Sequence, residues 1–328
     1  MSAETETATD ARGQRGFFAR LLASPFVSSL LSNRLAVVGL TIIGAMVVIA
    51  LYARFVLVGG FLSPNLGPLL GSQLGTTGYV GPCGANTLTG AASNAGSCAH
   101  PFGTDIQGRD ILSRTLYGAW LALKWGTITV VTSTVIGISL GIVAAYYGDL
   151  TDNVIMRTMD VLLAFPSLLL ALALVAIFPQ EWGLWRAVTA LILVYTPRFA
   201  RVVRGAALKV LEDEYVDATV ALGAKDPRVL VRHVLPNSLA PITVQSTLNF
   251  GLAIIDLAAL SFLGFGASAG TPSWGLMLSN GVDYGLLNGQ WWWSFFPGLF
   301  LAVTVLGFNL LGDGMRDALD PRMREAVD

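Results

Sequence analysis

The chain consists of long runs of apolar residues separated by short polar stretches. Five runs approach or exceed the roughly 20 residues that a helix needs to cross a bilayer. A sixth, Ala187–Pro197, is short and can span only within a helix over about Trp182–Val203 whose flanking arginines reach the two interfaces. The pattern predicts an all-α membrane protein with six transmembrane helices, the other five being Leu35–Ala53, Trp125–Tyr147, Val161–Phe178, Ser238–Gly264 and Trp291–Gly312.

The positions of Lys and Arg predict how these spans are oriented. With the N-terminus in the cytoplasm, fifteen of the 20 Lys and Arg residues fall on the inner side, as the positive-inside rule requires. Without the short fourth span, the basic loop after it would lie outside. We therefore keep this span and expect both termini to be cytoplasmic. The same arrangement brings all eight tryptophans near the outer interface, namely Trp120, Trp125, Trp182, Trp185, Trp274 and Trp291–Trp293.

Composition excludes several classes of function. Only 12% of residues are charged, about half the share of a soluble domain, and the net charge of −1 provides no basic field for nucleic acid. The two histidines and two cysteines lack the usual spacings of a metal site, and no reactive grouping of side chains predicts catalysis. There is no phosphate-binding GxxxxGK[ST] loop, so any ATP must be bound by another chain.

A long loop rich in Gly, Ser, Asn and Pro follows the first span and is expected on the outer side. It holds both cysteines, Cys83 and Cys98. Because the outside is oxidising, these cysteines can form a disulfide, worth about 3 kcal/mol for a loop of this length; the alternative is two unpaired residues. Within GTDIQGRD, the side chains of Asp105, Arg109 and Asp110 are expected to form an ion-pair cluster at the outer mouth, with a structural role or as a gate.

The polar stretch between the fourth and fifth spans predicts two short cytoplasmic helices. Leu211–Leu222 is helix-prone and starts with three acids, and Gly223 can end it with a positive φ. Asp226 suits an N-cap and Pro227 a first helical position, while Pro236 is expected to stop the second helix. Its apolar side, formed by Val229, Leu230 and Val234, is expected to dock into a groove of another protein.

This stretch, DATVALGAKDPRVLVRHVLP, resembles the EAA loop of ABC-importer permeases. Asp217, Ala218 and Thr219 stand in the Glu-Ala-Ala positions, and His233 takes the hydrophobic position, as is common in the peptide-transporter branch. The resemblance implies that the loop is a coupling helix that fits a cleft on an ATPase. The residues expected in this element are Tyr215, Asp217, Ala218, Thr219, Gly223, Ala224, Lys225, Asp226, Pro227, Arg228, His233, Leu235 and Pro236.

Further segments are similar to the C-type permease of dipeptide, oligopeptide and nickel ABC importers, in order and spacing from about Asn33 to Arg322. They are HPFGTDIQGRDILSRTLYGA, MRTMDVLLAFPSLLLALALVAIF, SFLGFG with PSWGLML, and FNLLGDGMRDALDPR. The resemblance implies alternating access by a type I importer fold. The implied partners are a B-type permease that completes the pathway, two cytoplasmic ATPase domains that carry ATP and Mg²⁺, an extracytoplasmic substrate-binding protein and membrane lipid.

A few polar residues lie within or beside the spans. Asp256 is expected either to line the pathway or a subunit contact, or to bond a neighbouring helix. Asp160 is a second pathway candidate, although it can also pair with Arg157 three residues earlier. Pro166 should kink its helix. Gly137 and Gly141 form a GxxxG pattern that permits close helix packing, and the acids and Arg316 near the end of the chain are expected to cap and pair.

The expected organisation begins with a cytoplasmic tail over 1–33, in which Phe17–Leu31 is a candidate interfacial helix and an unstructured tail is the alternative. A first span over 34–57, an outer loop over 58–114, a five-helix core over 115–312 and a cytoplasmic tail over 313–328 follow. The core contains the coupling loop 205–240. The sequence thus predicts a peptide-importer permease of the cell membrane that binds no cofactor itself. Two alternatives remain: a permease of the same family for nickel or another small solute, and a self-sufficient secondary transporter, against which we see no internal repeat.

Overall fold

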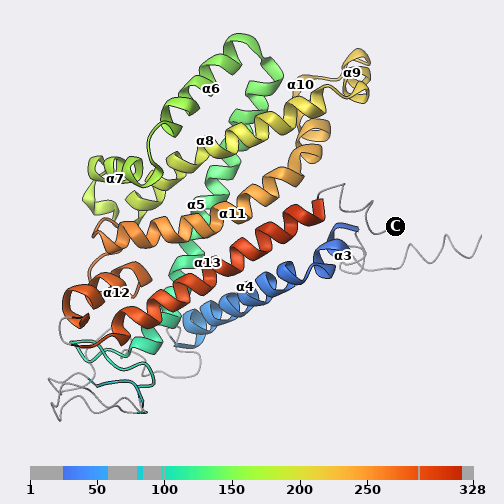
Figure 1. Cartoon of the computed structure of the whole chain (residues 1–328). Coiled ribbons are helices and arrows are strands. Elements are labelled where there is room, and N and C mark those ends of the chain that lie inside the picture. Colours follow the sequence, from blue (N-terminus) through green and yellow to red (C-terminus); the bar gives the residue numbers. More distant parts are fainter. Residues whose placement is uncertain (1–24, 58–79, 84–97, 99, 287–288, 320–328) are drawn as a thin grey trace, which may run out of the picture.

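The computed structural model describes residues 25–57, 80–83, 98, 100–286 and 289–319, and within these ranges every extended regular element is a helix (Figure 1). The long helices are α4 (Arg34–Tyr52), α5 (Ile111–Tyr147), α8 (Leu184–Leu211), α11 (Leu235–Phe262) and α13 (Trp292–Leu319). Shorter helices are α3 (Pro25–Ser32), α6 (Asp149–Leu163), α7 (Ser167–Ile177), α9 (Glu214–Ala221), α10 (Asp226–Val229) and α12 (Trp274–Asn280). π-Helical turns occupy Ala53–Leu57 (η1), Leu230–Val234 (η5) and Gly281–Gly285 (η6), and Gln180–Trp182 (η4) is a 3₁₀ turn.

Side chains just before the helices explain where several of them begin. Asn33 accepts hydrogen bonds from the first backbone N–H groups of α4, Asp110 accepts one from Ser113 at the start of α5, and Ser273 caps α12. These oxygens satisfy donors that have no partner inside a helix. At the other end of α5, Gly148 has φ +59 and turns the chain sharply into α6.

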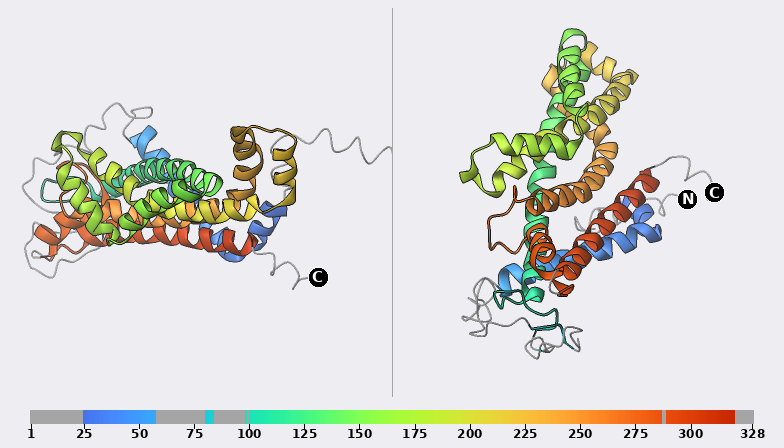
Figure 2. Two further views of the ribbon diagram at one scale, coloured as in Figure 1. Left: turned by 90° about the horizontal axis from the view of Figure 1, so that it is seen from above. Right: turned by 60° about the vertical axis from the view of Figure 1, so that its left-hand side comes forward.

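Glycines let α5 and α8 approach very closely. A Cβ on Gly137 would lie 2.3 Å from the Cβ of Phe199, and a Cβ on Gly141 would lie 2.6 Å from the carbonyl oxygen of Ala200. The GxxxG pattern of the sequence is therefore a packing contact, and its partner is α8. The pair α4 and α13 uses the same device, because a Cβ on Gly39 would lie 2.6 Å from the backbone nitrogen of Leu311. The right-hand view of Figure 2 shows α4 and α13 side by side.

The apolar run predicted as a single span, Val161–Phe178, is broken in the structure. It contains the end of α6 and all of α7, and the two helices meet at an angle of 95°. Pro166 stands between them with φ −54 and ψ 129, an extended conformation that cannot continue a helix. The proline thus does more than kink the span: it separates α6 from α7.

By length and hydropathy, fewer helices qualify as membrane spans than the six that the sequence predicts. Within the described residues, four helical stretches are long and apolar enough to cross a membrane, and the bent pair α6–α7 makes a fifth if counted as one span. The predicted fourth span corresponds to α8, which forms a 28-residue helix but carries charged residues along its length. Its apolar residues nevertheless form much of the largest buried cluster. The chain is therefore a multi-pass, all-helical membrane protein.

Three of the tryptophans predicted at the outer interface are instead buried in the protein. Trp274, Trp292 and Trp293 are each at most 3% exposed, and each donates an indole N–H to a backbone oxygen. By contrast, Trp182 and Trp185 are about half exposed, as an interfacial ring would be. The sequence could not distinguish rings facing lipid from rings that join helices.

Candidate functional site

A compact unit of two short helices projects at one end of the molecule, between α8 and α11 (Figure 1). α9 begins at Glu214, after Asp213 in an extended conformation, and ends before Gly223, whose φ of +80 reverses the chain. Glu214 and Asp217 lie in its first turn, where acidic groups favour the helix dipole. We call this segment, Glu214–Val229, the coupling unit.

Two helix boundaries predicted for the coupling unit are wrong by one to three residues. Leu211 is the last residue of α8 rather than the start of the next helix. Lys225, not Asp226, occupies the N-cap of α10, and Asp226 already lies inside the helix. The Asp226 carboxylate does not cap α10, because it accepts hydrogen bonds from the hydroxyl groups of Tyr146 and Tyr147 at the end of α5.

Pro236 does not stop the second helix. Helical structure runs without a break from Asp226 to Phe262, through α10, the π-helical turn η5 and α11. Pro236 lies in the first turn of α11, where the wider register of the preceding π turn accommodates its missing N–H. The coupling unit is thus continuous with the membrane helix that follows it.

The apolar side predicted for docking faces inward. Val229 and Val234 are fully buried, and Leu230 packs against the same cluster, which contains residues of α5, α8 and α11. The apolar side chains available to another protein are instead those of Leu222, which is 88% exposed, together with Val220, Tyr215 and Val231. Sequence reasoning named only Tyr215 of these four. The signal it missed is the apolar pair within VALG, at the tip of α9.

The remaining predicted residues divide into exposed and supporting positions. His233 and Tyr215 have their rings 6.2 Å apart, and Asn237 donates a hydrogen bond of 2.9 Å to the Tyr215 hydroxyl. Thr219 bonds back to the carbonyl oxygen of Tyr215, and Leu235 packs against the buried cluster. The exposed positions are Asp217, Ala218, Gly223, Lys225, Pro227, Arg228 and Pro236, with Ala224 half-buried.

At the opposite end of the molecule, the expected cluster of Asp105, Arg109 and Asp110 is divided into two parts. Asp105 pairs with Arg109 at 2.6 Å and also accepts the backbone N–H groups of Gln107 and Arg109. Asp110 belongs to a different group, because it caps α5 and lies 3.1 Å from His100. One carboxylate closes the loop and the other anchors the helix that follows.

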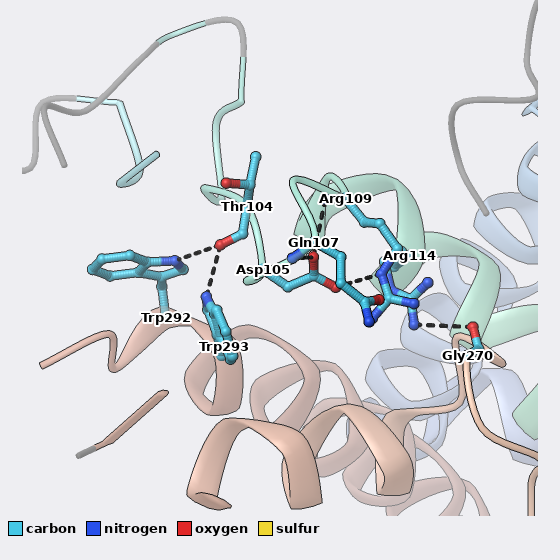
Figure 3. Close-up of polar contacts among 8 residues, drawn as sticks. All are labelled: Thr104, Asp105, Gln107, Arg109, Arg114, Gly270, Trp292 and Trp293. Atoms are coloured by element: carbon cyan, nitrogen blue, oxygen red, sulfur yellow. Dashed lines mark hydrogen bonds and ion pairs between the residues drawn. The ribbon is translucent and has the colours of Figure 1, made fainter. Parts of the chain in front are cut away.

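Residues 100–110, which we call the outer segment, are held in place by helices distant in sequence. The carbonyl oxygen of Thr104 accepts hydrogen bonds from Trp292 at 3.4 Å and from Trp293 at 2.7 Å (Figure 3). Arg114, which is 2% exposed, donates to the carbonyl oxygen of Gly270 at 3.3 Å. The segment is therefore bonded to the start of α13, and Asp110 at its end caps α5.

The cysteines of the outer loop lie beside this segment. A disulfide joins Cys83 to Cys98, with the Cα atoms 4.4 Å apart. Val80 and Thr104 exchange two hydrogen bonds, which attach the cysteine-containing stretch to the outer segment. Most of the loop over 58–114, like the tails over 1–24 and 320–328, lies outside the described residues.

The two carboxylates predicted as pathway candidates, Asp256 and Asp160, have partners on α8. Asp256 accepts a 2.6 Å hydrogen bond from the Tyr195 hydroxyl, which is the bond to a neighbouring helix that the sequence left open. Asp160 pairs with Arg201, and the predicted pairing with Arg157 is wrong. Asp152 forms a two-pronged ion pair with Arg204, with both contacts at 2.5 Å. These pairs fix α6 and α11 to α8. Near the end of α13, Asp317 accepts a hydrogen bond from Asn33.

The sequence matches one protein family and several named relatives. The profile of the family described as binding-protein-dependent transport system inner membrane component matches residues 137–325. The dipeptide transport system permease protein DppC of Alkalihalophilus pseudofirmus is 44% identical over 89% of this chain and 87% of its own length.

Two further relatives and one solved structure agree with this placement. The di/tripeptide permease DppC of Pseudomonas aeruginosa is 46% identical over 69% of this chain and 73% of its own length. DppC of Escherichia coli K12 is 44% identical over 72% of this chain and 77% of its own. A chain of the MetNI methionine ABC transporter, in inward-facing conformations, matches with a TM-score of 0.50 at 19% identity, over 64% of this chain and 98% of that one. That likeness shows a common fold.

Proposed function

The chain belongs to the family of binding-protein-dependent transport system inner membrane components, and we propose that it is the C-type permease subunit of an ATP-driven importer of dipeptides and oligopeptides. The relatives named for dipeptide and di/tripeptide transport support the class of solute. The chain forms half of a translocation pathway, and a B-type permease forms the other half. An extracytoplasmic binding protein delivers the peptide, and separate ATPase subunits hold the ATP and Mg²⁺.

The proposed topology has six crossings with both termini in the cytoplasm of an inner or plasma membrane. The four apolar helices and the bent pair α6–α7 supply five of these crossings. α8 supplies the sixth, because its buried apolar side packs among the others while its charged residues pair with α6. This topology puts α3, the coupling unit and the C-terminal end of α13 on the same side, and they do lie toward the same side of the molecule in both figures.

The exposure of Leu222 is the observation on which the ATPase contact rests. Leu222 is 88% exposed at the tip of a helix whose other side is anchored by the buried Val216, and the exposed Val220, Tyr215 and Val231 extend its apolar surface. An exposed group of apolar side chains suits contact with another protein. The coupling unit thus has one face attached to the membrane helices and another that is free for the ATPase. Closure of the two ATPase domains on ATP would move this unit and, with it, the helices behind it.

Co-purification of the ATPase subunits with the permease tests this contact. We expect Leu222→Glu to reduce the co-purified ATPase about tenfold or more, because the substitution puts a charge into the proposed pocket. The matched control is Leu150→Glu, since Leu150 is 76% exposed at the start of α6 but lies outside the coupling unit. Unchanged recovery of ATPase with Leu222→Glu would contradict the proposal.

A further inference from the structure

We propose that Asp226, Tyr146 and Tyr147 form a latch that transfers the movement of the coupling unit into α5, and that α5 carries this movement to the outer end of the molecule. The inference rests on the proposed function, because it assigns a route for the motion that the ATPases would produce. It makes the three side chains positioning residues for transport, with no contact of their own to the ATPase or to the peptide.

The latch is a single carboxylate held by two neighbouring hydroxyl groups. Tyr146 donates to Oδ1 of Asp226 at 3.0 Å, and Tyr147 donates to Oδ2 at 3.4 Å. The two rings stand perpendicular to each other with their centroids 5.2 Å apart. Because the tyrosines are the last two residues of α5 and Asp226 is the first of α10, the bonds join the ends of two helices. Hydrogen bonds to a charged acceptor are stronger than neutral ones.

Buried apolar side chains also connect the start of α10 to the end of α5. Val229, one helical turn after Asp226, is fully buried in a cluster that also contains Ala145, directly before Tyr146, and Ile142, one turn before it. The carboxylate therefore does not have to hold α10 in place alone. It fixes the direction in which α10 can move relative to α5, while the buried contacts keep the two helices together.

The far end of α5 lies at the outer segment. The helix runs without a break over 37 residues, which is about 55 Å at 1.5 Å per residue. At its outer end Asp110 caps it, Arg114 bonds Gly270, and the carbonyl oxygen of Thr115 accepts the indole N–H of Trp274 at 2.9 Å. Figure 1 shows α5 reaching from the end with the coupling unit to the end with the outer segment. An axial or rotational shift of one end must therefore appear at the other.

Nucleotide-dependent labelling of the outer segment tests the route. The reporter is Gln107→Cys, an exposed position beside the Asp105–Arg109 pair, in a complex with the partner permease, ATPases and binding protein in lipid nanodiscs. Its rate of reaction with a maleimide is compared without nucleotide and after trapping with ATP and vanadate, in the absence of reductant. We expect the double variant Tyr146→Phe/Tyr147→Phe to lose most of the difference in rate. In proteoliposomes that contain the same complex, we expect its uptake of dialanine per ATP to fall about fivefold.

Two further variants separate a latch from a general loss of structure. Asp226→Ala should have the same effect, and adding it to the tyrosine variant should cause no further loss, because all three groups act as one unit. Tyr52→Phe, a half-exposed tyrosine on α4, is the control and should behave as wild type.

Each outcome decides between specific alternatives. If the double variant keeps the full nucleotide-dependent change in labelling and normal uptake per ATP, the latch is refuted. If the double variant loses its ATPase subunits, the tyrosines shape the docking surface and do not transmit motion, which also refutes it. If the wild-type permease itself binds no ATPase, the proposed function is refuted. This result differs from the two outcomes that refute only the latch, because in both of those the wild-type permease still binds its ATPases.

Discussion

At the scale of single residues, the glycines of α5 determine how closely the helix can approach α8. Gly137 and Gly141 face Phe199, Ala200 and Val203 at distances that leave no room for a Cβ. The contact places α8 in the interior, among apolar helices, despite its arginines. Small residues are the usual means of close approach between membrane helices, because lipid offers no hydrophobic driving force for association.

Gly137→Ala should therefore destabilise the protein, by about 1–3 kcal/mol for overpacking. The added methyl would lie 2.3 Å from the Cβ of Phe199, and a helix backbone must shift to relieve the overlap. Gly205→Ala is the matched control, since a Cβ at Gly205 meets nothing within 4 Å, and a gain in helix propensity should leave it equally or more stable. Thermal unfolding in detergent measures both, and equal unfolding temperatures for the two variants would show that the contact is not tight.

The sequence predicted these residues better than it predicted their partners. The GxxxG pattern indicates close packing but not which helix it packs against. For Asp160 the sequence offers a pathway role or a pairing with Arg157, whereas the structure pairs it with Arg201 on another helix. A spacing of three or four residues describes neighbours on one helix only. Pairings between helices depend on how the whole bundle packs, so one sequence without its tertiary contacts cannot supply them.

At the scale of elements, prolines and glycines set the shape of the coupling unit. Gly223 behaves as its sequence context predicts, because only a positive φ lets the chain reverse between α9 and α10. Pro236 does not, because the π-helical turn before it lets the helix continue. Propensity rules describe a regular α-helix, so they cannot predict the π-helical change of register in η5. The same limit applies to Pro166, whose break is far sharper than a kink.

Gly223 can be tested by two substitutions that differ only in their tolerance of a positive φ. Gly223→Val should cost the turn about 1–2 kcal/mol, because a Cβ-branched residue is strained in the left-handed region. It should therefore lower the recovery of ATPase with the purified permease. Gly223→Asn should retain most of the recovery, since asparagine adopts this conformation readily. Equal recovery with the two variants would show that ATPase binding does not depend on the turn.

At the scale of the whole molecule, the charge distribution and apolar runs predicted an all-helical membrane protein, and the structure and comparisons agree on this class. The sixth crossing is the part that hydropathy leaves undecided. α8 must bury its apolar residues against α5, α7 and α11 and pair its arginines with α6. A window of local hydropathy cannot detect such compensation, because the partners lie far away in sequence.

The crossing by α8 predicts that its two ends face opposite sides of the membrane. Single cysteines in place of the exposed Glu181 and Glu212 should react with a membrane-impermeant maleimide from opposite sides of sealed vesicles. Glu181→Cys should be labelled from the outside and Glu212→Cys from the cytoplasmic side. Labelling of both from the same side would remove the sixth crossing and reverse the orientation of everything after it.

The central claim is that this chain moves peptides only as part of an ATP-driven assembly that acts through the coupling unit. The most direct measurement is uptake of a radiolabelled dipeptide into proteoliposomes that contain the permease pair, with binding protein and peptide on one side and ATPases with ATP and Mg²⁺ on the other. The account predicts ATP-dependent uptake by the wild-type assembly, lost with Leu222→Glu and retained with Leu150→Glu. Uptake by this chain alone, without ATPases or ATP, would contradict it and identify a self-sufficient transporter.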